Sequence, residues 1–60
     1  MSMIWLTDAK SQGKVALNTE HIVAIFKAND GEFANKTIVG LINGQIAVEE
    51  DDLTVVGMLQ

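Results

Sequence analysis

The sequence predicts a mainly β fold: a small twisted antiparallel sheet, or an SH3-like half-open barrel, of about five strands with a short C-terminal helix or a sixth strand. Three observations support this prediction. Short runs rich in β-branched residues recur along the chain, an Asn-Gly pair separates two of them, and an acidic stretch precedes the last apolar run. Residues 1–60 are expected to form one small domain.

The Asn43-Gly44 pair predicts a β-hairpin between residues 37–42 and 45–48. Asn-Gly favours a two-residue type I′ turn because both residues tolerate positive φ. The register that follows is Ile42–Gln45, Leu41–Ile46, Gly40–Ala47 and Val39–Val48. Because side chains alternate along a strand, we expect one apolar face made of Val39, Leu41, Ile46 and Val48.

Three more strands are expected before this hairpin, over residues 3–7, 14–17 and 22–27. Asn18 can accept a backbone N–H two or three residues later, which predicts a short 3₁₀ or α turn over residues 18–21. Residues 29–36 are expected to form a longer loop that bends at Asp30-Gly31.

The C-terminal segment is compatible with two structures. Acidic residues 49–52 stand before the apolar residues 53–59, as at the N-terminus of a helix. Val55, Val56 and Gly57 lower the helix propensity. We favour a helix of two turns, with a sixth strand as the alternative.

The composition limits the function. The chain has four Lys and no Arg against eight Asp plus Glu, giving a net charge of −4, which argues against binding to nucleic acid. The absence of Cys excludes disulfides and cysteine zinc sites. No apolar run approaches the ~20 residues that cross a bilayer, so no membrane insertion is expected, and a cytoplasmic location is expected.

No set of residues for catalysis or cofactor binding stands out, so we expect no enzyme, no cofactor and no metal. The acidic residues 49–52 offer oxygen ligands but lack the spacing of a calcium loop, which favours a solvated turn. His21 is the only imidazole and has no evident nucleophile or orienting group.

Three residues are candidates for contact with another molecule: Trp5, Phe33 and His21. Trp5 is either an anchor within the fold or an interface residue, since tryptophan is frequent at interfaces. Phe33 stands in a polar loop, where it either folds back or contacts a partner. An apolar content of 48% in so short a chain favours a homo-oligomer.

The order of features resembles the FlbD/SwrD family of short bacterial proteins associated with flagellar motility. The resemblance runs from Ile4 to about Val56. It rests on Ile4-x-Leu6-Thr7, Leu17-Asn18, Ile22-x-x-Ile25, Leu41-x-Asn43-Gly44 and Val48-x-Glu50. It implies an accessory role in motility and supplies no catalytic residues.

We therefore expect a small non-enzymatic accessory or regulatory protein that acts by protein–protein interaction. One alternative is a small protein encoded by a phage or mobile element. Another is a nucleic-acid-binding regulator, because Leu17-Asn18, His21-Ile22 and Asn43-Gly44 faintly resemble the β-rich half of LytTR domains. The acidic residues that follow this hairpin disfavour the second alternative.

Overall fold

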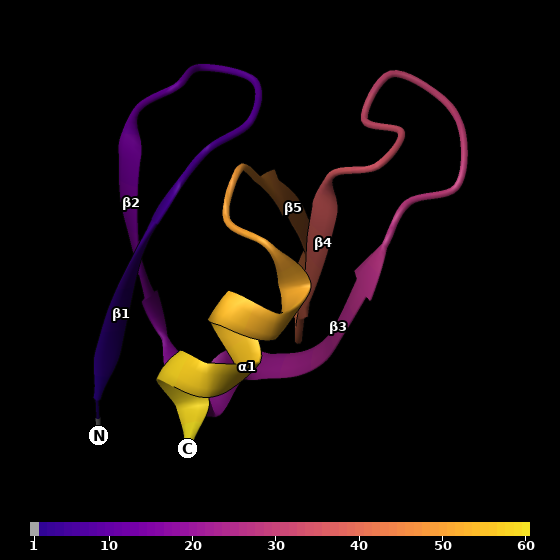
Figure 1. Ribbon diagram of the computed structural model, residues 1–60. Coiled ribbons are helices and arrows are strands. Elements are labelled where there is room, and N and C mark those ends of the chain that lie inside the picture. Colours follow the sequence, from indigo (N-terminus) through magenta and orange to yellow (C-terminus); the bar gives the residue numbers. More distant parts are fainter. Residues whose placement is uncertain (1) are drawn as a thin grey trace.

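The computed structural model describes residues 2–60, which form five strands, a 3₁₀ turn and a C-terminal helix (Figure 1). The elements are β1 (Met3–Thr7), β2 (Lys14–Asn18), η1 (Thr19–His21), β3 (Ile22–Lys27), β4 (Thr37–Leu41), β5 (Gly44–Val48) and α1 (Asp52–Leu59). The predicted mainly β fold is confirmed. The C-terminal segment is the helix, so the sixth strand is wrong.

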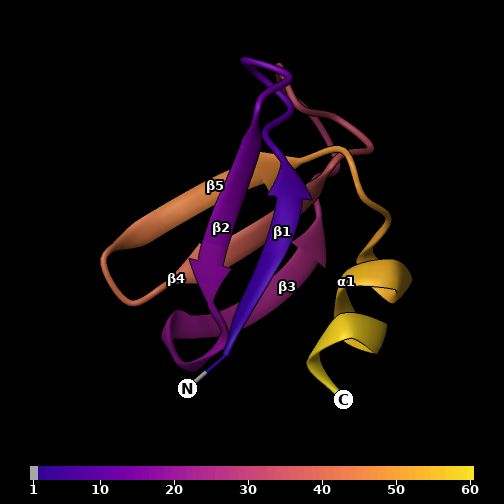
Figure 2. The same ribbon diagram turned by 90° about the vertical axis from the view of Figure 1, so that its left-hand side faces the viewer.

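The strands divide into two antiparallel sheets. One is the β1–β2 hairpin, and the other has the order β3-β4-β5. The hairpin crosses in front of the three-stranded sheet (Figure 2). Ile4 and Leu6 of β1 are buried with Val39 and Val48 of the other sheet, so the core lies between the two sheets.

The two sheets are joined where β1 ends. Asp8 forms an isolated antiparallel bridge with Val48, and the Glu49 N–H donates to the Thr7 carbonyl at 2.9 Å. This joint continues the hydrogen bonding of β1 onto the end of β5. It joins the two sheets by backbone hydrogen bonds at this end.

The carboxylate of Glu50 reinforces this joint. The Thr7 N–H donates to both carboxylate oxygens, at 2.8 and 3.1 Å, and the Thr7 hydroxyl donates to Oε2 at 3.0 Å. Burial raises the pKa of Glu50, but the hydrogen bonds from Thr7 and the charge of Lys14 together lower it below the usual value of 4.5. The ionised carboxylate is therefore the form that the folded chain favours.

The register of the β4–β5 hairpin differs from the prediction. The observed pairs are Leu41–Gly44, Gly40–Gln45, Val39–Ile46, Ile38–Ala47 and Thr37–Val48. The turn therefore consists of Ile42 and Asn43, and neither has a positive φ, so the predicted type I′ turn is wrong. The Ile42 N–H donates to the His21 carbonyl at 3.1 Å, which ties the turn to η1.

The predicted apolar face of this hairpin is confirmed although its register is wrong. Val39 and Val48 are buried in the core, and Leu41 and Ile46 pack against it. In the observed register each residue of β4 pairs with a residue of β5 two positions earlier than predicted. Because side chains alternate between the two faces with a period of two, this shift leaves the same residues on the same face.

The link between β2 and β3 follows the prediction. Thr19–His21 forms a 3₁₀ turn, and the Glu20 N–H donates to Asn18 Oδ1 at 2.9 Å. This side-chain cap satisfies a backbone donor that the short turn leaves unpaired. The chain therefore passes from one sheet to the other without a long connection.

Replacing Glu50 by alanine is expected to lower the free energy of unfolding by roughly 2 kcal/mol, because hydrogen bonds to a charged acceptor are lost and the Thr7 N–H is left without that partner. Urea unfolding followed by circular dichroism measures the loss. Glu32→Ala is the matched control, since Glu32 is exposed, and it is expected to change stability by less than about 0.5 kcal/mol. Equal stability of the two variants would contradict the role given to Glu50.

The same carboxylate predicts a dependence of stability on pH. Because the folded-state pKa of Glu50 is lowered, its contribution is complete above its ordinary pKa of 4.5 and is lost as the pH falls through the folded-state pKa. Stability of the natural chain should fall between about pH 5 and pH 3, and the fall should be shallower in Glu50→Gln. Glu32→Gln should keep the steeper slope, and an unchanged slope in Glu50→Gln would contradict the assignment.

Candidate interaction surfaces

Helix α1 begins at an acidic cap. Asp51 is the N-cap residue, and its carboxylate accepts a hydrogen bond from the Leu53 N–H at 3.2 Å. Asp52 lies in the first turn, where its negative charge interacts favourably with the positive end of the helix dipole. Lys27 of β3 lies 3.5 Å from Asp51, which ties the start of the helix to the three-stranded sheet.

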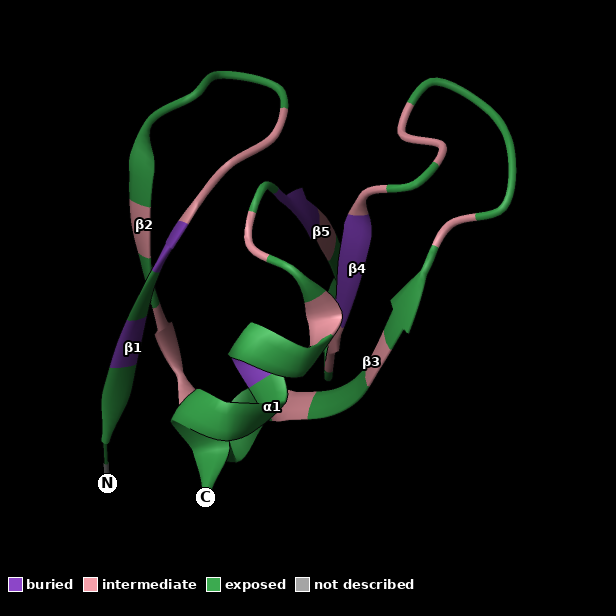
Figure 3. Ribbon diagram, viewed as in Figure 1, coloured by how far each residue is buried: buried purple, intermediate pink, exposed green. Residues whose placement is uncertain are grey.

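The helix carries apolar residues on all its sides and buries only Val55. Leu53 is 77% exposed, and Val56, Met58 and Leu59 are exposed too. Figure 3 shows that most of α1 is open to solvent. A helix that is apolar all round is normally buried, so this one presents surface that the single chain leaves uncovered.

Strand β1 also carries exposed apolar side chains. Alternation along the strand places Ile4 and Leu6 in the core and turns Met3 and Trp5 outward. Trp5 is 63% exposed. Helix α1 packs mainly against β3, and the end of β3 is drawn between β1 and α1 in Figure 2. We use the name β1–α1 surface for the exposed apolar residues of the two elements, which are Met3, Trp5, Leu53, Val56, Met58 and Leu59.

The three candidate residues are not brought together. Trp5 projects from β1, His21 ends η1 with an exposed side chain, and Phe33 lies in the loop between β3 and β4. That loop is at the opposite end of the molecule from η1 (Figure 1). Trp5 is therefore an exposed residue and not a core anchor, and it belongs to the β1–α1 surface.

Phe33 folds back onto the domain. It is partly buried, and the loop that carries it is closed by backbone hydrogen bonds between Ala28 and Lys36 and between Asn35 and Ala28. Gly31, at the predicted bend, has a φ of +88°, which glycine adopts without strain. Phe33 lines a cavity of about 410 Å³ together with Phe26, Asp30 and Glu32. Sequence reasoning did not single out Phe26, because it stands within a strand among other apolar residues.

The acidic residues 49–52 are used separately. Glu49 accepts hydrogen bonds from Lys36 Nζ at 2.5 Å and from Gln12 Nε2 at 2.9 Å, and these bonds lower its pKa. Glu50 binds Thr7 and Asp51 caps the helix. Within residues 2–60 no group of three or more His, Asp or Glu side chains is placed to hold a metal ion.

No helix within residues 2–60 is long and apolar enough to cross a membrane. Comparison of the chain with protein-family models, curated proteins and solved structures finds no match. The β1–α1 surface and the cavity beside Phe33 are therefore the two features from which a function can be argued.

The packing of α1 makes a prediction about its stability. Val55→Ala should lower the free energy of unfolding by roughly 2 kcal/mol, because it removes two buried methyl groups from the one contact by which α1 reaches the core. Val23→Ala is the matched control, since the Val23 side chain of β3 is 65% exposed, and it should cost much less. Thermal unfolding by circular dichroism compares the two, and equal losses would contradict the contact assigned to Val55.

Proposed function

We propose that the protein is a small non-enzymatic accessory or regulatory protein that acts by protein–protein interaction, and that it forms a homo-oligomer through the β1–α1 surface. The observation that carries the proposal is the helix α1, which is apolar on all sides and buries only Val55. Exposure of this apolar surface to water is unfavourable. Burying it against a second copy would therefore lower the free energy.

The size of the core supports self-association. Among residues 2–60, the buried apolar residues are Ile4, Leu6, Ile38, Val39, Ala47, Val48 and Val55. A domain of about 60 residues has little core to begin with, and no disulfide is available. Burying the β1–α1 surface of two copies against each other would add apolar contact at the cost of little polar surface.

The identity of the exposed residues also supports this interface. Tryptophan and methionine are enriched in interface cores, and a central tryptophan carries a large share of binding energy at many interfaces. Trp5 and Met3 occupy alternate positions of β1, and α1 contributes the exposed Met58. The charged residues of the 49–52 run stand directly before the helix in the chain.

The resemblance to the FlbD/SwrD family adds bacterial motility to the proposal as the process that the protein serves. A cytoplasmic location and an SH3-like arrangement of the strands belong to the same proposal. The arrangement of β1 against the end of β5 supports the latter, since it carries the hydrogen bonding from one sheet to the other. Deletion of the gene in its host, followed by a swarming assay, tests the part that concerns motility.

Light scattering over a concentration series is expected to give a mass above that of one 6.5 kDa chain. Trp5 fluorescence should shift to the blue as the oligomer forms, because the indole leaves water. Trp5→Lys should shift the mass toward the monomer, since it places a charge in an apolar interface.

Ile42→Lys is the matched control for this experiment. Ile42 is 65% exposed, close to the exposure of Trp5, and it lies in the β4–β5 turn far from α1 (Figure 2). The control should keep the mass of the natural chain. The proposed interface would be contradicted if the natural chain is a monomer at all concentrations, or if Trp5→Lys and Ile42→Lys lower the mass equally.

A further inference from the structure

A cavity lies on the face of the three-stranded sheet that points away from the core. The register places Phe26, Ile38 and Ala47 in one row across β3, β4 and β5 on this outer face. Ile38 and Ala47 are buried even though they face away from the β1–β2 hairpin. Ile38 and residues of the β3–β4 loop line a cavity of about 410 Å³ on this face.

Two phenylalanine side chains line the cavity. Phe26 stands on the sheet and is 47% exposed, and Phe33 contributes the loop side. The volume falls within the range of pockets that hold small ligands or side chains. Phenyl faces attract cations through the negative potential of the ring.

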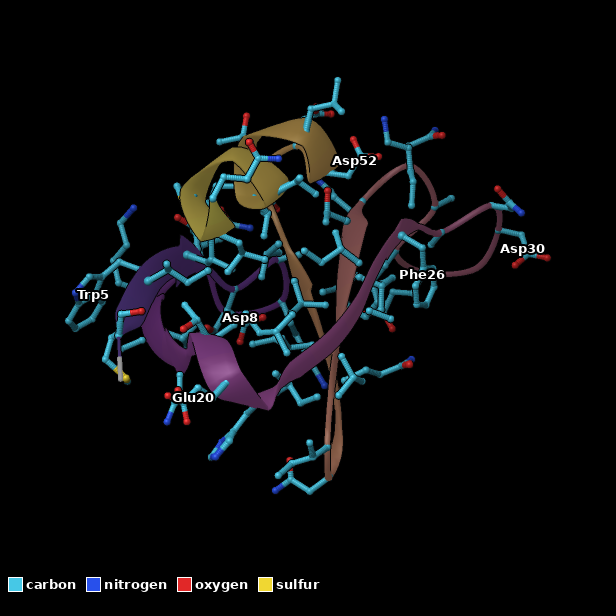
Figure 4. The ribbon with its side chains drawn as sticks, turned by 90° about the horizontal axis from the view of Figure 1, so that it is seen from below. Trp5, Asp8, Glu20, Phe26, Asp30 and Asp52 are labelled. Carbon is cyan, nitrogen blue, oxygen red and sulfur yellow. The ribbon has the colours of Figure 1, made fainter. Side chains whose placement is uncertain are left out.

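Two carboxylates also line the cavity. Asp30 and Glu32 of the loop both line it, and neither carboxylate has a hydrogen bond or ion pair within the part of the chain that the structure describes. Figure 4 shows Phe26 and Asp30 at the same end of the molecule. Among the described residues that line the cavity, Lys27 is the only cation, and it lies 3.5 Å from Asp51 at the start of α1. The carboxylates of Asp30 and Glu32 are therefore available to a ligand.

From this combination we infer that the cavity binds an arginine side chain from a segment of a different protein. Aromatic faces and paired carboxylates are the two groups that a guanidinium engages best, by stacking and by two-pronged hydrogen bonds. The chain has no arginine, so a second copy cannot supply this group. The net charge of −4 also favours the approach of a basic partner.

This site is separate from the proposed interface between copies. Figure 4 places Trp5 at one end of the molecule and Phe26 with Asp30 at the other. The inference goes beyond the proposed function, because it names a second site and the chemistry of its ligand. Either proposal can fail without the other.

A capped heptapeptide, Gly-Ser-Arg-Leu-Arg-Ser-Gly, is the probe for this site, with the same peptide carrying citrulline in place of both arginines as its neutral control. Proton–nitrogen correlation spectra of the full chain should show shifts at the amides of Gly31, Phe33 and Gln45 with the arginine peptide. The citrulline peptide should bind at least about tenfold more weakly, because it lacks the charge. Added salt should weaken the arginine complex.

Two variants test the residues of the cavity. The double variant Asp30→Asn, Glu32→Gln should weaken binding of the arginine peptide about tenfold or more, because it removes both carboxylates with little change of shape. The charge-matched control is Asp8→Asn, Glu20→Gln, whose positions lie away from Phe26 and Asp30 in Figure 4, and it should bind within about twofold of the natural chain. Phe26→Leu, which keeps an apolar side chain, tests the contribution of the aromatic ring and should also weaken binding.

Any of the following results would overturn the inference. They are equal binding of the arginine and citrulline peptides, equal losses in the two double variants, and the absence of any shift at about 5 mM peptide. Shifts confined to β1 and α1 would likewise assign the peptide to the other surface. Light scattering of the same samples reports the oligomeric state, so a failure of this site is distinguished from a failure of the proposed interface.

Discussion

The joint between the end of β1 and the end of β5 is the contact on which the rest of the structure depends. Two strands and three strands are each too few to enclose a core alone, and the joint holds their inner faces together. The Asp8–Val48 bridge supplies backbone pairing, and the Glu50 carboxylate collects the Thr7 N–H and hydroxyl beside it. The Glu50 carboxylate thus accepts a hydrogen bond from the Thr7 N–H, a backbone donor that is not paired within either sheet.

The joint also explains why the acidic run carries no site of its own. Glu49, Glu50 and Asp51 follow β5 directly, and each turns to a different partner: Lys36, Thr7 and the helix N-terminus. Within these four residues the chain leaves β5, forms the hydrogen bonds that hold the end of β1, and begins α1. In the sequence this acidic run resembles a cation site, but in the structure its carboxylates form hydrogen bonds within the chain.

The sequence predicted the elements and the buried faces well, but not the turn of the last hairpin. Alternation of apolar residues fixes which side of a strand is buried, so Val39 and Val48 could be placed in the core without knowing their partners. The pairing itself depends on long-range contacts, here the bond from the Ile42 N–H to the His21 carbonyl and the bridge from Asp8 to Val48. The cavity beside Phe26 could not be predicted for the same reason, because it exists only where the 29–36 loop folds onto the sheet.

The two proposed surfaces differ in chemistry as well as in position, and this difference decides how they would act together. A second copy can cover the apolar residues of β1 and α1, but it cannot supply a guanidinium to the cavity, because the chain contains no arginine. Self-association would therefore leave the cavity of each copy open and carry two or more of them on one particle. A partner with several arginine-bearing segments would then bind the oligomer more tightly than the monomer, since the second contact becomes intramolecular. In that arrangement the oligomer's task is to raise the affinity of a weak, charge-directed site.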